Sequence, residues 1–71
     1  MTVTLHQFTP PVDWNESDLK AFLKADRGWF RQQRVDHAWM RKRTCDPMDV
    51  NGRRFWSAVL FRLGFERLAR R

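Results

Sequence analysis

Four Trp and six Phe side chains in a chain of 71 residues place the strongest constraint on the fold. A disordered basic tail would be poor in aromatic residues, so we expect one small domain with an aromatic core. Its size is near the lower limit for a domain that folds without disulfides or structural metal ions. The single cysteine, Cys45, excludes an internal disulfide. A domain this small has little room for a preorganised catalytic pocket, so we expect no enzyme activity and no catalytic residues.

Positive charge is confined to one part of the chain. All fourteen Lys and Arg residues, eleven of them Arg, lie between Lys20 and Arg71. Residues 1–18 carry three acids and no base, whereas residues 19–71 carry fourteen bases and five acids, a net charge of +9. Such a charge favours a polyanionic partner, most commonly the phosphate backbone of a nucleic acid.

The first half of the chain predicts an extended arm followed by two short helices. Pro10 and Pro11 disfavour regular structure, so we expect an extended N-terminal arm over residues 1–14. Asn15, with Asp18 three residues later, is a helix-capping pattern. It precedes an apolar stripe that predicts a helix over residues 16–25: Leu19, Phe22 and Leu23. Residues 26–28 predict a turn, and a second, basic helix is expected from residue 28 or 29 to about residue 37.

The second half predicts a β-hairpin and a closing helix. Residues 39–44 alternate loosely and fit a strand, and residues 45–52 form a loop that ends in the tight-turn pair Asn51-Gly52. Residues 53–56 fit a short returning strand, and Ser57 is placed to cap a last helix from Ala58 onward. We therefore expect a mainly α fold with a small β-hairpin. Residues 15–71 would form a winged helix-turn-helix domain, comprising a helix-turn-helix, a two-stranded basic wing and a C-terminal helix.

This layout predicts where DNA would bind. The second helix is expected to meet base edges and phosphates through a set of Arg and Gln side chains: Arg27, Arg31, Gln32, Gln33 and Arg34. The alternative is that these residues form an ordinary solvated helix face. The two strands concentrate five bases and no acid, which is typical of a wing on the DNA backbone or minor groove: Arg41, Lys42, Arg43, Arg53 and Arg54. The basic end of the last helix would contact DNA or a neighbouring protein: Arg67, Arg70 and Arg71.

The stretch from Asp18 to Leu63 resembles the small winged-helix excisionases, or recombination directionality factors, of phages, and the related AlpA-type prophage regulators. The matching text is DLKAFLKADRGWFRQQR, then NGRRFW, then SAVLFRL, and Asn51 to Trp56 is its most specific part. The resemblance implies sequence-specific binding of double-stranded DNA that is cooperative and bends DNA. It also implies a role in directing a tyrosine or serine integrase toward excision, or in regulating prophage genes.

A winged domain of this size covers little DNA, so we expect copies side by side on direct repeats. Opposite charges could join them head to tail, with the C-terminal bases meeting three acids near the N-terminus: Asp13, Glu16 and Asp18. No cofactor is expected. The soft metal ligands His6, His37 and Cys45 are too widely spaced to predict a metal site. The four Trp side chains are expected in the core rather than stacked on unpaired bases.

Two other function classes remain open. One is a small phage-type inhibitor that docks its basic face on an acidic or nucleic-acid-binding host protein. The other is a membrane-surface peptide, because residues 53–71 alone form a cationic amphipathic pattern. No apolar run approaches the roughly 20 residues needed to span a bilayer, and the N-terminus lacks a signal pattern, so we expect a cytoplasmic protein.

Overall fold

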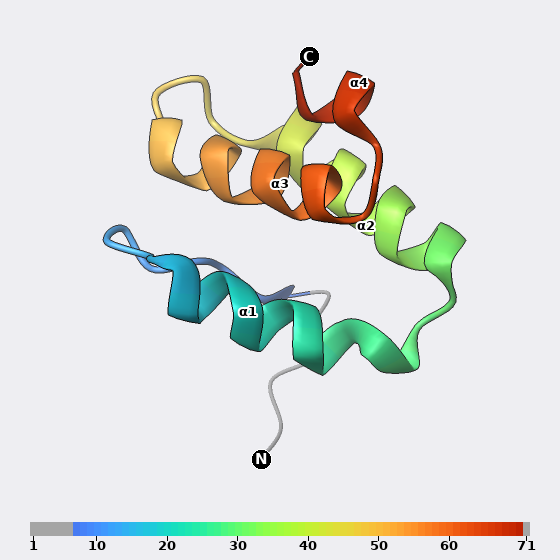
Figure 1. The fold of residues 1–71 in the computed structure, drawn as a ribbon. Helices are drawn as coiled ribbons and strands as arrows, with labels where there is room; N and C mark the ends of the chain where they lie inside the picture. The colour runs from blue at the N-terminus through green and yellow to red at the C-terminus, as the bar shows by residue number, and fades with distance from the viewer. Residues whose placement is uncertain (1–6, 71) are drawn as a thin grey trace.

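The computed structural model describes residues 7–70, and in this part of the chain it contains helices and no strand (Figure 1). Helices α2 and α3 pack against each other, and α1 and α4 both contact α3. Figure 1 shows α1 and α4 on opposite sides of α3. The elements in chain order are α1 (Glu16–Ala25), the 3₁₀ turn η2 (Asp26–Gly28), α2 (Arg31–Thr44), α3 (Val50–Arg62) and α4 (Glu66–Ala69).

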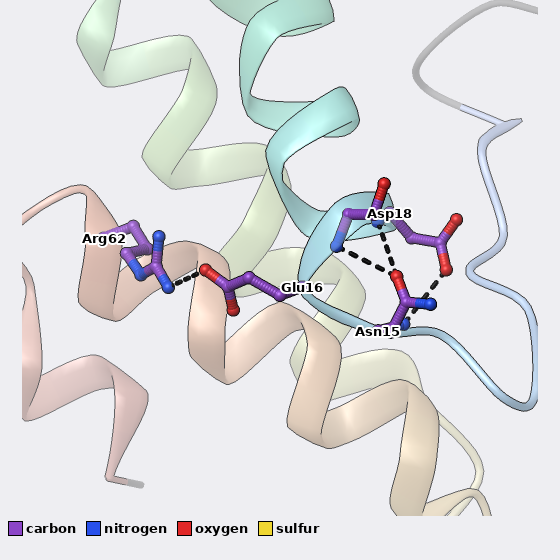
Figure 2. A network of polar contacts seen from close by, with 5 residues as sticks. Asn15, Glu16, Asp18 and Arg62 are labelled. Atoms are coloured by element: carbon purple, nitrogen blue, oxygen red, sulfur yellow. Dashed lines mark hydrogen bonds and ion pairs between the residues drawn. The ribbon is translucent and has the colours of Figure 1, made fainter.

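Helix α1 forms as its sequence predicts, because its start is fixed by a capping box. The Asn15 side chain accepts the backbone N–H groups of Ser17, at 2.9 Å, and Asp18, at 3.2 Å. The Asp18 carboxylate in turn accepts the Asn15 backbone N–H at 3.0 Å (Figure 2). These bonds satisfy amide groups that would otherwise lack a partner at the first turn. Leu19 and Phe22 are buried on one face, so the predicted helix over residues 16–25 is confirmed.

The predicted wing is wrong. Residues 39–44, expected to be a strand, form the second half of α2, and residues 53–56 lie inside α3. The buried positions of α2 include Val35, Ala38 and Lys42, which recur at intervals of three and four residues. That spacing places them on one side of a helix, whereas a strand would bury alternate residues. The basic run at residues 41–43 therefore belongs to a helix that continues past the predicted end at residue 37.

The Asn51-Gly52 pair does not make a hairpin turn, because Asp49 caps a helix there. The Asp49 carboxylate accepts the Gly52 backbone N–H at 3.0 Å, and α3 starts at Val50. A Cβ atom at Gly52 would overlap that carboxylate, so the glycine provides space for the cap rather than a turn. Ser57, predicted to be a helix cap, lies in the middle of α3.

A glycine ends α3. Gly64 has a backbone φ of +91°, a left-handed conformation that non-glycine residues rarely adopt. The Phe65 N–H donates to the Leu60 carbonyl at 2.9 Å, which closes the end of the helix. The predicted closing helix is thus two helices, α3 and the short α4, separated by this turn.

The core is aromatic, as the composition predicts. Phe55 and Trp56 of α3 are fully buried, with ring centroids 5.0 Å apart and nearly perpendicular planes. The remaining buried apolar side chains come from α1, α2 and the end of α3: Leu19, Phe22, Val35, Ala38, Val59, Leu60 and Leu63. The predicted arm joins this core within residues 7–14. Phe8 packs on Phe22 and Phe55 with centroid distances of 5.0 and 5.6 Å.

The other tryptophans also pack against the protein rather than standing free. Trp14 and Trp39 are half-buried and pack against the core, and the Trp14 indole N–H donates to the Asn51 carbonyl at 2.8 Å. Trp29 packs against the buried His37 ring in an edge-to-face arrangement, with ring centroids 5.1 Å apart. No helix in residues 7–70 is both long enough and apolar enough to cross a membrane.

Candidate anion-binding groove

A groove of about 740 Å³ brings six basic side chains together between α1, η2, the start of α2 and the end of α3. Two leucines, Leu23 and Leu63, also line it, and no acidic side chain of residues 7–70 does. The six bases are Lys20, Lys24, Arg27, Arg31, Arg34 and Arg62. These six bases come from four elements, and the fold adds the distant Arg62 to five bases that lie within residues 20–34.

Three of the six bases are unpaired cations at the surface. Lys20, Lys24 and Arg27 are exposed, and none of them forms an ion pair within residues 7–70. Lys20 and Lys24 lie one turn apart on α1, and Arg27 follows in η2. Like charges at this spacing repel one another, so an anion bound among them would relieve an unfavourable interaction.

Arg31 lines the groove and also joins two helices. Its Nη2 donates to the Leu63 carbonyl at 2.6 Å, and its guanidinium carbon lies 5.1 Å from the centre of the Phe65 ring. The carbonyl belongs to the end of α3, so Arg31 connects the start of α2 to the end of α3. A guanidinium has five N–H donors, and one bond to a carbonyl leaves others for an anion.

Arg34 is held by a buried acid. Its Nη2 lies 2.8 Å from Oδ1 of Asp26, whose side chain is 1% exposed, and it also donates to the Leu23 carbonyl at 3.4 Å. Burial raises the pKa of the Asp26 carboxyl above its ordinary value of 3.8, and the neighbouring Arg34 opposes that rise. The pair fixes η2 against α2 and offsets one positive charge of the groove.

Arg62 is paired at the edge of the groove. Figure 2 shows its guanidinium reaching from α3 to the Glu16 carboxylate, beside the capping box that starts α1. Both side chains are substantially exposed, so this ion pair contributes little to stability. It does orient Arg62 and connects the end of α3 to the start of α1.

Two of the five residues predicted for the wing are turned into the protein. Arg41 donates to the Phe8 carbonyl at 2.7 Å and lies 5.4 Å from the Trp56 ring centre. Lys42 is 4% exposed, and its Nζ donates to the carbonyls of Leu68, at 2.6 Å, and Ala69, at 2.9 Å. Burial, followed by repulsion from Arg53, lowers the pKa of the Lys42 ammonium below its ordinary value. Both residues therefore anchor chain segments.

The other three predicted wing residues are exposed on two helices. Arg43 lies on α2 with its guanidinium 5.9 Å from the Trp39 ring centre, and Arg53 and Arg54 lie on α3. No β-hairpin joins these helices within residues 7–70, and of the five residues predicted for the wing only these three are exposed.

The residues predicted for the recognition helix are divided between two surfaces. Arg27, Arg31 and Arg34 line the groove, whereas Gln32 and Gln33 line a separate hollow with Phe30 and Met40. Gln32 donates to Oδ1 of Asp36 at 2.9 Å. The exposed side of α2 therefore carries a carboxylate and apolar groups. A recognition helix was expected to present Arg and Gln side chains there.

Sequence reasoning missed three groove residues: Lys20, Lys24 and Arg62. Lys20, Lys24 and Arg27 recur at intervals of four and three residues, and this spacing could have indicated a basic stripe on the first helix. Arg62 lies 35 positions after Arg27, and no local sequence pattern indicates that it belongs to the same groove.

The C-terminal bases are only partly described. Arg67 and Arg70 are exposed, with Arg70 4.0 Å from Glu66, and Arg71 lies outside the described residues. Of the acids expected to meet them in a neighbouring copy, Glu16 pairs with Arg62 and Asp18 caps α1. His6 also lies outside the described part. Within residues 7–70, no three His, Cys, Asp or Glu side chains are placed to hold a metal ion.

Comparisons with protein-family models, with curated proteins and with solved structures gave no match. The Asn51 to Trp56 segment, the most specific part of the resemblance to excisionases, lies inside a helix rather than a wing.

Proposed function

We propose that the protein binds the phosphate backbone of double-stranded DNA through the basic groove. The observation that carries this proposal is the convergence of six Lys and Arg side chains on a groove that, in the described part of the chain, no acid lines. Two of the six are offset by Asp26 and Glu16, which leaves a clear excess of positive charge. Such a site attracts a polyanion and gains affinity by releasing its counterions.

The chemistry of the lining favours backbone contacts over base readout. Lys and Arg positioned on phosphates fix a protein on DNA without reading its sequence. Of the residues that the structure describes, no Asn or Gln of the kind that reads adenine lines the groove, because Gln32 and Gln33 lie on another surface. We therefore expect binding with little dependence on sequence.

A duplex is favoured over a single strand. Proteins that bind single strands combine a basic groove with aromatic side chains on which bases stack. Among residues 7–70, the apolar residues that line this groove are Leu23 and Leu63, and no aromatic ring lines it. The roles that the resemblance implies, in excision, DNA bending and cooperative binding to repeats, remain predictions.

The experiment compares two triple variants by fluorescence anisotropy on a random-sequence duplex. The groove variant replaces the three unpaired cations: Lys20→Ala, Lys24→Ala and Arg27→Ala. The control removes the same charge from exposed positions elsewhere: Arg53→Ala, Arg54→Ala and Arg67→Ala. Titrations at about 50 mM and about 200 mM salt give the dependence of log K on log salt, which changes by roughly 0.9 for each phosphate that the variant no longer neutralises.

We expect the groove variant to bind more weakly and to show a salt slope lower by roughly 2–3, with a smaller change in the control. Absence of duplex binding by the unmodified protein at the lower salt concentration would overturn the proposal. Equal reductions in affinity in the two variants would assign binding to diffuse charge rather than to the groove. Tighter binding to a single strand of the same length would refute the preference for a duplex.

A further inference from the structure

The outward side of α2 is an exposed surface of mixed polar and apolar character that is separate from the groove. Phe30 and Met40 are 85% and 53% exposed. A hollow of about 490 Å³ contains both of them, and a second of about 290 Å³ contains Trp39, Met40 and Arg43. Met40 belongs to both, so the surface is continuous along the helix. We call it the α2 outer face, defined by Phe30, Gln33, Asp36, Met40 and Arg43.

Charge is balanced on this face, although the chain has a net charge of +6. Asp36 is its single acid and Arg43 its single base, because Arg31, Arg34, Arg41 and Lys42 make contacts elsewhere. Asp36 and Arg43 are seven residues apart, which is close to two helical turns, so they share one side of α2. Neither forms an ion pair within residues 7–70.

We propose that a second copy of this chain docks on the α2 outer face, with the two α2 helices antiparallel about a two-fold axis. A two-fold interface requires one surface to be complementary to itself. With the axis near Trp39 and Met40, Asp36 of each copy faces Arg43 of the other. The pairing forms two equivalent ion pairs around a centre of Met40 and half-buried Trp39 side chains.

Charge identifies a second copy as the occupant. The basic groove would repel another basic groove, whereas the α2 outer face allows two copies to approach with opposite charges aligned. The helix has 14 residues, which corresponds to a length of about 21 Å, so the paired area is below that of a standard interface. We therefore expect a weak dimer, with a dissociation constant on the order of 100 µM. This inference does not depend on DNA binding.

The test is sedimentation equilibrium without DNA, at protein concentrations from about 10 µM to about 1 mM, a range that covers weak interfaces. Asp36→Arg raises the net charge of the chain by two units, and Arg43→Asp lowers it by two. If net charge governed association, the first change would weaken the dimer and the second would strengthen it. Pairing on the α2 outer face predicts that each change weakens the dimer at least tenfold, since each places like charges opposite each other.

Mixing the two variants gives the sharpest result. One carries two bases on the face and the other two acids, so an equimolar mixture should form a heterodimer tighter than either homodimer. The control is Arg54→Asp, the same charge change at an exposed base on α3, which should leave the dimer intact. Circular dichroism confirms the fold of each variant. A protein that is monomeric up to about 1 mM, single variants that dimerise unchanged, or a mixture that does not associate would each overturn the proposal.

Discussion

Lys42→Met should destabilise the protein, because Lys42 anchors the C-terminal helix. Its Nζ donates to the carbonyls of Leu68 and Ala69 at 2.6 and 2.9 Å, while its side chain is 4% exposed. Methionine has similar length and apolar character but donates no hydrogen bond. The variant therefore removes the two bonds and the charge without opening a large cavity.

The size of the effect follows from two opposing contributions. Each hydrogen bond from a charged donor contributes about 1.5–3 kcal/mol, and removing both also frees α4 from α2. The variant in turn removes the cost of burying an ammonium group, which is the main cause of the lowered pKa of Lys42. We expect a net loss of about 1–3 kcal/mol in the free energy of unfolding. A domain of this size has a total of roughly 4–10 kcal/mol, so the loss is readily measured.

Urea unfolding followed by tryptophan fluorescence and circular dichroism gives the free energy directly. The matched control is Arg43→Met, which removes the same charge at the next residue, where the side chain is exposed and contacts the Trp39 ring but donates no hydrogen bond to a carbonyl of residues 7–70. That variant should change stability by less than about 0.5 kcal/mol. If Lys42→Met were as stable as the control while binding DNA more weakly, Lys42 would act at a binding surface, and its role as an anchor would be refuted.

Three further changes test the fold by urea unfolding. Asn15→Ala removes the capping box and should cost about 0.5–2 kcal/mol, whereas an unchanged free energy would show that the cap contributes nothing. Gly64→Ala places a side chain at a φ of +91° and should cost about 1 kcal/mol or more, unless the turn adopts another conformation. The pKa of Asp26 lies above 3.8 in the folded protein, so the folded state binds this proton more tightly than the unfolded chain does. The resulting gain in the free energy of unfolding is largest below pH 3.8 and is lost as pH rises through the folded pKa. Relative to Asp26→Asn, the unmodified protein should therefore gain stability between about pH 7 and about pH 4, by at most about 1.4 kcal/mol per unit, and a constant difference would contradict the raised pKa.

Helix α1 could be predicted from the sequence because its determinants are local. Asn15, Asp18 and the buried Leu19 and Phe22 lie within eight residues, and the bonds of the capping box all lie within residues 15–18. The aromatic core was predicted for a similar reason, since ten large aromatic side chains have few other places in a small domain.

The wing was mispredicted because its signals depend on contacts outside the local sequence. Asn51-Gly52 favours a tight turn in isolation, but the Asp49 cap three residues before Gly52 favours a helix start, and packing of Phe55 and Trp56 supports the helix. Lys42 concealed the periodicity of α2, since a lysine at a core position reads as a surface residue. Its burial is possible because two α4 carbonyls accept hydrogen bonds from its ammonium group. Those carbonyls belong to residues 26 and 27 positions away in the sequence.

The groove shows why a count of basic residues overstates the charge available to a ligand. Arg31 and Arg34 line it, yet each already binds a backbone carbonyl, and Arg34 also neutralises Asp26. Replacing either one would change stability and anion binding together, so weaker binding would not identify a phosphate contact. Lys20 and Lys24 are exposed on α1 and form no ion pair within residues 7–70. Substitutions at these two lysines therefore separate binding from folding, which substitutions at Arg31 and Arg34 cannot do.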